Sequence, residues 1–210
     1  IMKINELSTR NINEGVAYSI GLVYPLIKEV KYEGINHLAG QVNHQSNMIT
    51  DAELTTHFKL IYDFLSTHIP EGFLLLSNLE NKLSTKKGFS ILIESDSVCN
   101  NDILNKIVEI IRNSDLEIKK YFVRGCFDGR SSYDKSSGYL SIDVDRDYSK
   151  QAIIKEIIAS FDIDVNLNTR DYDHKKNDQI RIQRKSLKDF ISKIGLFSLR
   201  RNKILLDRDK

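Results

Sequence analysis

A repeated pattern that spans nearly the whole chain limits its possible folds more than any other feature. Gly21 lies in an apolar stretch with helical spacing, and Gly125 lies in a second such stretch, 104 residues further along a chain of 210. Around each glycine, the apolar and turn residues indicate the same order of elements: helix, two strands, helix, two strands, helix. Such repetition indicates two copies of one structural unit. The sequence therefore predicts an α+β fold of two pseudo-symmetric αββαββα units, within residues 1–115 and 116–210.

Hydrophobic spacing and breaker residues give the bounds of the predicted elements. Pro25 lacks a backbone N–H, so it should end the first helix near Tyr24. Helices are predicted at residues 14–28, 51–68, 101–114, 119–129, 149–161 and from Ser186 to Ile194. Strands are predicted at 29–33, 36–45, 72–78, 88–95, 164–170 and 178–184, with two more within 130–145. Because side chains alternate along a strand, each antiparallel sheet should have one face under helices and one exposed polar face.

Composition places the chain among globular proteins, because 40% of its residues are hydrophobic and 29% are charged. The chain lacks a run of roughly 18 apolar residues, so we expect neither a transmembrane helix nor a membrane partner. The polar N-terminus lacks the apolar core of a signal peptide. Two cysteines, Cys99 and Cys126, are too few for a disulfide framework or a zinc site. We therefore expect a reducing compartment, which is the cytoplasm or else an organelle or the nucleoid.

Charge is unevenly distributed along the chain. The formal net charge is +2, but the segment Asp164–Lys210 contains 13 Lys and Arg against seven Asp. A basic C-terminal quarter suits contact with a polyanion such as a nucleic acid. A solvated charged surface without a partner is the alternative.

The helix that opens the second unit contains the sequence Val-Arg-Gly-Cys-Phe-Asp-Gly-Arg-Ser at 123–131. This segment resembles the motif helix of the LAGLIDADG homing endonucleases. Gly125 matches the first glycine of the motif. Phe127 and Asp128 match its Ile-Asp pair, and Gly129 matches the small residue that follows.

The first copy of the motif is fainter. The sequence Ser-Ile-Gly-Leu-Val-Tyr-Pro-Leu-Ile at 19–27 retains only Gly21, Leu22 and Val23 of the pattern. A physical reason supports the two glycines, since crossing helices approach closely only where their side chains are small. A glycine in a helix interior otherwise costs up to about 1 kcal/mol relative to alanine.

The resemblance implies a saddle of two antiparallel sheets whose exposed faces lie along the major groove of double-stranded DNA. It also implies a monomer with an internal twofold axis, and RNA is a further possible partner because some family members assist intron splicing. Asn and Gln can pair with adenine, and Arg with guanine. The candidate DNA-binding residues are His37, Gln41, Asn43, Gln45, Arg130, Ser141, Asn166, Asn168, Arg170, Arg181 and Gln183. Loop lysines that could meet phosphates are Lys82, Lys86, Lys87, Lys175 and Lys176.

One predicted strand disagrees with DNA binding. In the sequence around 139–147, Ser141, Asp143, Asp145 and Asp147 alternate with apolar residues. Carboxylates on one strand face would repel phosphates. They could instead accept from cytosine amino groups, bind a metal, face away from DNA, or be ordinary surface acids.

The cleavage centre that the resemblance implies is degenerate. Active family members hold divalent metals with the acidic residue just before the motif's final glycine in each copy. Here those positions hold Leu26 and Arg130, and neither offers a carboxylate. Asp128 matches the earlier motif aspartate, and Tyr24 takes its place in the first copy. We therefore expect inactive cleavage and no cofactor, while Arg130 would place a positive charge beside the DNA backbone.

Alternative functions stay open at this point. Asp128 could act catalytically in an endonuclease if Asp128, Asp143 and Asp145 converged on Mg²⁺ from the helix end and the neighbouring strand. The chain would then be a homing or restriction-like enzyme. An intron maturase, a transcription regulator and a module whose sheet face meets protein are further alternatives.

Overall fold

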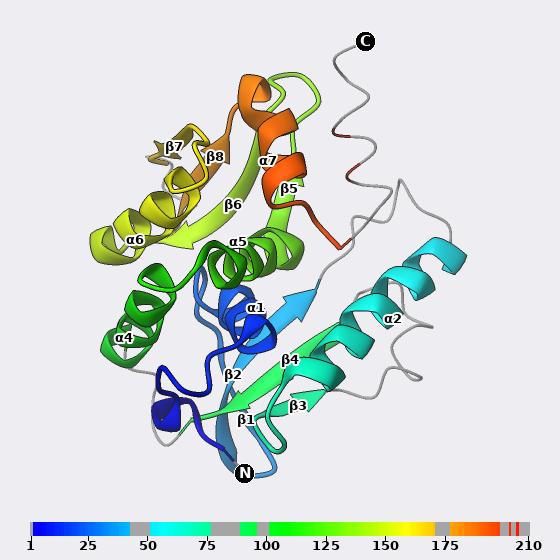
Figure 1. Ribbon diagram of the computed structural model, residues 1–210, viewed down its shortest axis with the longest axis vertical. Helices are drawn as coiled ribbons and strands as arrows, with labels where there is room; N and C mark the ends of the chain where they lie inside the picture. The colour runs from blue at the N-terminus through cyan, green and yellow to red at the C-terminus, as the bar shows by residue number, and fades with distance from the viewer. Residues whose placement is uncertain are drawn as a thin grey trace.

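The structure is a computed structural model that describes residues 2–42, 51–76, 89–95, 101–170 and 177–197, together with Asn202 and Leu205. At residues 51, 53–55, 74–76, 89 and 130 it describes the backbone alone. Two four-stranded antiparallel sheets lie at opposite ends of the molecule, and helices α1 (Glu14–Val23) and α5 (Leu116–Arg130) cross between them (Figure 1). The fold is therefore α+β, as the sequence predicts.

The two sheets have the same strand order. The first runs β1-β2-β4-β3 and the second β5-β6-β8-β7. The strands of the first sheet are β1 Glu29–Tyr32, β2 Ile35–Val42, β3 Leu74–Leu76 and β4 Phe89–Glu94. Those of the second are β5 Ser131–Tyr133, β6 Leu140–Asp145, β7 Val165–Asn168 and β8 Asn177–Ile182.

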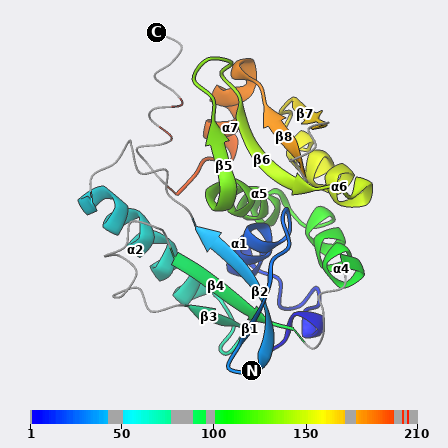
Figure 2. The ribbon, with the colours of Figure 1, turned by 180° about the vertical axis from the view of Figure 1, so that it is seen from behind.

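Helices cover one face of each sheet. The remaining helices are α2 (Asp51–His68), α4 (Asn101–Arg112), α6 (Tyr148–Ala159) and α7 (Leu187–Lys193). Figure 1 shows α2 in front of the first sheet, and α6 and α7 in front of the second. Seen from behind, the strands of both sheets lie nearer the viewer than these helices (Figure 2). The two helix-free faces therefore point to the same side of the molecule.

Buried branched side chains hold each sheet to its helices. Alternation places Leu38 and Val42 of β2 on the helix-covered face, with Ile91 of β4 beside them. In the second sheet, Ile142 of β6 and Ile180 of β8 lie directly opposite one another and are fully or almost fully buried. Each sheet thus has a buried apolar face, and its other face is available for contacts outside the chain.

Helices α1 and α5 pack backbone to backbone at their glycines. A Cβ atom at Gly21 would collide with the carbonyl oxygen of Phe122, and one at Gly125 would collide with that of Tyr18. The contact is reciprocal, because each glycine meets the residue three positions before the other. Glycine is therefore required at both positions for this helix pair to form.

Several helices differ from their predicted bounds. Helix α1 ends at Val23 instead of 28, before Pro25, and α4 and α6 each end two residues early. Two further differences have a local cause. Helix α5 begins at Leu116 instead of 119, because the Asp115 side chain accepts from the Ile118 N–H at 3.0 Å and caps an earlier start. The last predicted helix begins as a 3₁₀ turn, Arg184–Ser186, and becomes α-helical only at α7. Neither difference changes the order of elements.

No helix among the described residues is both long and apolar enough to cross a membrane. Cys126 of α5 is a free, buried thiol, and burial raises its pKa far above the usual range. Cys99 lies outside the described residues.

Candidate nucleic-acid interface

The helix-free face of the second sheet gathers most of the predicted DNA-binding residues that the structure describes. Pairing between strands sets Ser141 opposite Arg181, and Arg181 opposite Asn166, so these three share one face. Asn168 and Asp143 flank Gln179 on the same face. The predicted face is polar, and it consists of Ser132, Ser141, Asp143, Gln179, Arg181, Asn166 and Asn168. It is only partly exposed, because Ser141 and Gln179 are buried, with 7% and 9% exposed.

A hydrogen-bonded chain runs across this face. Asp143 accepts from Arg170 Nη2 at 3.0 Å and from Gln179 Nε2 at 3.2 Å. Gln179 Oε1 in turn accepts from Arg181 Nε at 3.3 Å and Nη2 at 3.1 Å. The Arg181 guanidinium also lies 5.1 Å from the centre of the Tyr139 ring. These contacts hold both arginines in fixed positions before any partner arrives.

The chain of bonds explains the acidic residue at the centre of the face. The Asp143 carboxylate forms an ion pair with Arg170 at 3.0 Å, which offsets its charge. Phosphate repulsion by Asp143 is reduced accordingly. The residue acts as an acceptor that orients Arg170 and Gln179.

Asp145 has a different role, because it joins the second sheet to the end of α1. Its carboxylate accepts from Lys150 Nζ at 2.7 Å and from the Ile27 N–H at 3.2 Å. Its own N–H donates to the carbonyl of Pro25 at 2.8 Å. Lys150 is completely buried, and its ammonium lies 5.0 Å from the centre of the Tyr24 ring. A buried ammonium thus occupies the space between Asp145 and the first motif segment.

Asp147 does not share the strand face, contrary to the alternation in the sequence. It lies beyond β6 and caps helix α6, where its side chain accepts from the Lys150 N–H at 3.1 Å. Strand β6 ends at Asp145, so the alternation of acids continues past the strand itself.

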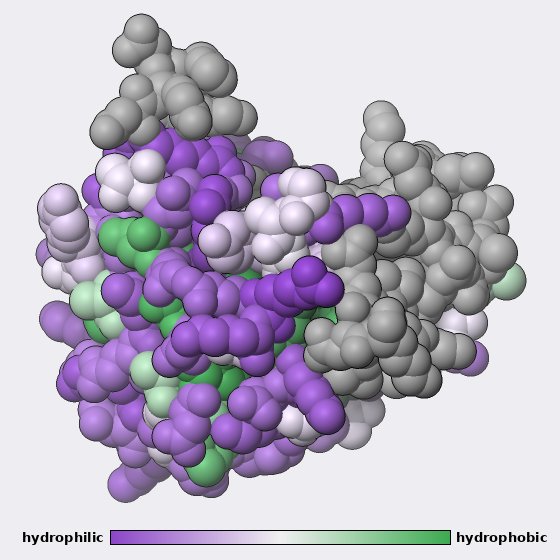
Figure 3. All heavy atoms as spheres, turned by 90° about the horizontal axis from the view of Figure 1, so that it is seen from above, coloured by the Kyte–Doolittle hydropathy of each residue, from purple (hydrophilic) through white to green (hydrophobic). Residues whose placement is uncertain are grey.

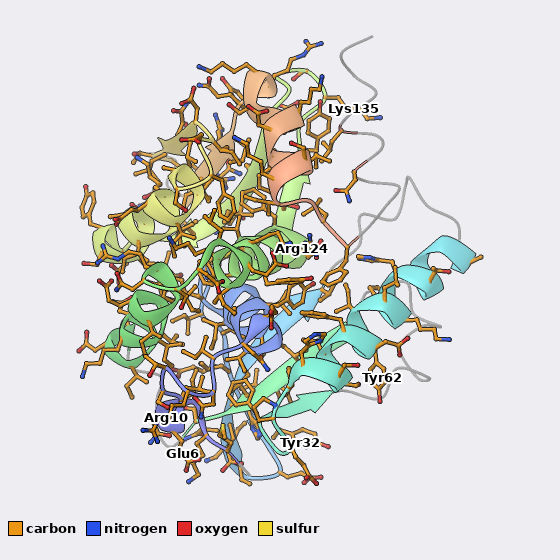
Figure 4. The ribbon with its side chains drawn as sticks, in the orientation of Figure 1. Glu6, Arg10, Tyr32, Tyr62, Arg124 and Lys135 are labelled. Carbon is orange, nitrogen blue, oxygen red and sulfur yellow. The ribbon has the colours of Figure 1, made fainter. Side chains whose placement is uncertain are left out.

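Asp128 is buried between the motif helices and the C-terminal segment. Only 4% of it is exposed, and it accepts from the Tyr18 hydroxyl at 3.0 Å and from the Phe197 N–H at 3.3 Å. Burial, together with the Asp128 charge, raises the pKa of Tyr18 well above its usual value. Tyr18 therefore stays a neutral donor to this carboxylate. Arg124 stacks over Phe197 at 5.0 Å and fixes the same segment (Figure 4).

The structure does not bring the three candidate metal ligands together. Asp128 bonds to Tyr18, Asp143 to Arg170 and Asp145 to Lys150. Across the described part of the chain, no group of three or more His, Cys, Asp or Glu side chains is placed to hold a metal ion.

In the part of the first sheet that the structure describes, the predicted polar residues are less exposed than the sequence indicates. His37 is buried, with 6% exposed, and its Nδ1 lies 2.9 Å from the carbonyl oxygen of Ile35. Gln41 is half-buried opposite Ser90. Asn43 and Gln45 lie outside the described residues.

The remaining candidates lie at the ends of elements. Leu26 is half-buried just after α1, and Arg130 is the last residue of α5, described by its backbone alone. Gln183 is half-buried and follows β8. The predicted phosphate-binding lysines Lys82, Lys86, Lys87, Lys175 and Lys176 lie outside the described residues.

The sequence analysis missed two features of this region. Lys150 reads as a surface residue of an amphipathic helix, and only its position five residues after Asp145 hints at the ion pair. Tyr32 and Ile35 are 45% and 43% exposed on the helix-free face of the first sheet. The sequence did contain a signal for this. Tyr32 lies two residues after Val30, and Ile35 lies two residues before His37, so alternation along the strands places them on the same face as those residues.

Polar residues dominate the end of the molecule that carries the second sheet. Seen from above in Figure 3, the described surface is mainly hydrophilic, and apolar atoms show only in gaps between polar side chains. This appearance agrees with a solvated surface that could accept a charged partner.

Comparison with known proteins gives matches in structure alone. No protein-family model matches the sequence, and no curated protein does. A variant of the homing endonuclease I-DmoI, in complex with its target DNA and in the presence of manganese, matches with a TM-score of 0.54 at 15% identity. That match covers 88% of this chain and 95% of the I-DmoI chain.

A second group of structures matches equally well. The N-terminal LAGLIDADG domain of DUF199/WhiA has a TM-score of 0.54 at 14% identity, covering 91% of this chain and 88% of that one. Full-length DUF199/WhiA from Thermatoga maritima has a TM-score of 0.55 at 12% identity, covering 99% of this chain and 64% of the other. The chain therefore has a LAGLIDADG-like fold.

Proposed function

We propose that this chain is a sequence-specific DNA-binding protein whose helix-free sheet faces lie in the major groove of a duplex. The observation that carries the proposal is the bonded row of Arg170, Asp143, Gln179 and Arg181 on the second sheet. A β-sheet face can enter the major groove, and Arg reads guanine there through paired hydrogen bonds. A row of oriented polar side chains on such a face suits that task.

The fold supports this proposal. Several solved I-DmoI structures with this fold contain DNA, among them a complex with DNA and calcium that matches 94% of this chain with a TM-score of 0.53. The basic C-terminal quarter of the sequence adds the attraction to phosphates that DNA-binding proteins need.

We further propose that one chain suffices for binding. The reciprocal contact of Gly21 with Phe122 and of Gly125 with Tyr18, and the equal strand order of the sheets, support two related units with an internal twofold axis. The division between them falls at Asp115, which caps α5. A monomer would then offer the arrangement that other proteins reach by dimerising.

The cleavage centre is proposed to be inactive. The residues near the end of α1 do not fit a divalent metal. Leu26 has a hydrocarbon side chain, and Asp145 of β6, which bonds to the backbone at Pro25 and Ile27, is already paired with Lys150. Asp128 is bonded to Tyr18 and the Phe197 backbone. An endonuclease with displaced carboxylates would need these acids to converge, and the described positions do not favour it.

The proposal is tested by duplex binding of single variants across a salt series. Arg181→Ala should weaken binding to the preferred duplex by about 10- to 100-fold, since a paired Arg–guanine contact contributes roughly 1–3 kcal/mol. Lys59→Ala is the matched control and should bind normally, because Lys59 is an exposed residue of α2 on the helix side and lies outside the basic C-terminal quarter. Wild-type affinity should fall steeply with salt. Equal affinity of both variants, or binding without salt dependence, would contradict the proposal.

A further inference from the structure

The two helix-free faces differ in chemistry although their strands have the same order. Along β6 and β8, Asp143 faces Gln179 and Ser141 faces Arg181. The two motif glycines are 104 residues apart, so Asp143 and Ser141 of β6 correspond to Ala39 and His37 of β2. In the first sheet, Ala39 faces Leu92 and His37 faces Glu94. Where the second sheet carries Asp143, Gln179 and Arg181, the first therefore carries Ala39, Leu92 and Glu94.

The outer end of the first sheet carries two large, exposed side chains with apolar surface. Tyr32 pairs with Ile35 beside the turn at Glu33 and Gly34, and both side chains are nearly half exposed. Figure 4 shows Tyr32 at the end of the molecule farthest from the second sheet. Among the described residues of β1, β2 and β4, the helix-free face carries no Lys or Arg. Its members are Val30, Tyr32, Ile35, His37, Ala39, Gln41, Ser90, Leu92 and Glu94.

A face of this kind can still recognise a base pair in the major groove. Thymine is the base that presents an apolar group there, its C5-methyl, and apolar side chains recognise it by contact. Burying a group of this size is worth about 0.8 kcal/mol. Ile35 and the Tyr32 ring offer exposed apolar surface on the same side of the molecule as the arginine row, as Figure 2 shows for the two sheets.

We propose that the DNA target is chemically asymmetric: Tyr32 and Ile35 recognise thymine methyl groups at the outer end of one half-site, and Arg181 recognises guanine in the other. The inference rests on the proposed function, since it names the base chemistry that each sheet reads. Because the two helix-free faces lie on one side of the molecule, the duplex that contacts the arginines of the second sheet would also contact Tyr32 and Ile35.

Base analogues test the inference directly. The preferred site is first selected from a randomised duplex pool, and each thymine is then replaced singly by uracil, which lacks only the methyl group. At one or more outer thymines of one half-site, uracil should weaken binding about fourfold, the equivalent of the ~0.8 kcal/mol of a buried methyl-sized group. In the other half-site, 7-deazaguanine should weaken binding because it lacks the N7 acceptor.

Variants assign the effect to the side chains. In Ile35→Ala the penalty for uracil should disappear, whereas in Leu60→Ala it should persist. Leu60 is a matched control, because it is 41% exposed but belongs to α2 on the helix side. If uracil is tolerated at every thymine of a selected site, the asymmetric readout is overturned while DNA binding stands. If no site is selected at all, the proposed function itself fails.

Discussion

Lys150 illustrates how a single buried charge can connect the two halves of the molecule. It is completely buried, and its ammonium contacts Asp145 at 2.7 Å and the face of Tyr24. Asp145 in turn bonds to the backbone at Pro25 and Ile27. Removing the ammonium would leave the Asp145 carboxylate with the Ile27 N–H and partial solvation as compensation, because the Asp145 side chain is 33% exposed.

Lys150→Met should therefore lower the free energy of unfolding by about 1–2 kcal/mol, less than for a fully buried pair. Chemical denaturation is the measurement, and Lys155→Met, on the same helix but partly exposed, is the control. Adding Asp145→Asn to Lys150→Met should restore part of the stability, because both charges are then absent. A loss no larger than that of the control would show that the pair contributes little.

Asp134 predicts a local pH response in the turn between β5 and β6. Its carboxylate accepts from the Ser136 hydroxyl at 2.7 Å, the Ser137 hydroxyl at 2.8 Å and the Ser136 N–H at 2.8 Å. These bonds lower the pKa of Asp134 from 3.8 to about 2, and the bond from the Ser136 hydroxyl contributes most. A lowered pKa means that the turn is stabilised above pH 3.8 and loses that stabilisation as the pH falls through about 2.

An NMR titration of the Ser136 and Ser137 amides checks this. Their shifts should move with a midpoint near pH 2, and the transition should be absent in Asp134→Asn. A midpoint close to pH 4 would mean that the three bonds do not persist in solution.

At the scale of elements, the crossing of α1 and α5 depends on two glycines. A side-chain carbon at Gly21 or Gly125 meets a backbone carbonyl of the facing helix, which cannot rotate away. At Gly129, such a carbon would lie 3.2 Å from the flexible Leu22 Cδ2 and 3.3 Å from the carbonyl oxygen of Gln41, so no atom is close enough to collide.

Gly21→Ala and Gly125→Ala should each cost more than about 3 kcal/mol, at or beyond the usual range for overpacking. Gly129→Ala should cost clearly less, because both of its neighbours lie beyond 3 Å and need to give way by only a few tenths of an ångström. Thermal unfolding of the three variants gives the comparison. Equal losses at all three positions would contradict the close helix crossing.

The order of elements was predictable because each depends on local patterns. The alternation at Leu38, Gly40 and Val42 identified the buried face of β2, and the glycine spacing identified the helix pair. The start of α5 was missed because capping by Asp115 adds a turn that hydrophobic spacing does not reveal.

The candidate site was predictable only in part. Alternation placed Asn166 and Arg181 on a common face, but it could not show that Arg170 offsets the charge of Asp143, since that contact spans 27 residues. The burial of Lys150 and the exposure of Tyr32 likewise depend on how helices and strands pack together. Tertiary contacts of this kind join segments that are far apart in the sequence, so the pattern of one segment does not reveal them.

At the scale of the whole molecule, the fold is similar to that of DNA-cleaving enzymes, whereas the described acids do not converge as a metal site would require. The LAGLIDADG-like fold includes homing endonucleases such as I-DmoI. In this chain, Asp128 is bonded to Tyr18, Asp143 to Arg170 and Asp145 to Lys150. These three acids form no metal site among the described residues. We therefore propose that the sheets recognise DNA and that the motif ends do not cleave it.

One measurement tests that separation most directly. The protein is incubated with a randomised duplex pool and Mg²⁺, and both the retained and the cut molecules are sequenced. We expect retained, intact duplexes that share a defined site. Cut ends at a defined site would contradict it, and would show that Leu26 and Arg130 do not disable cleavage.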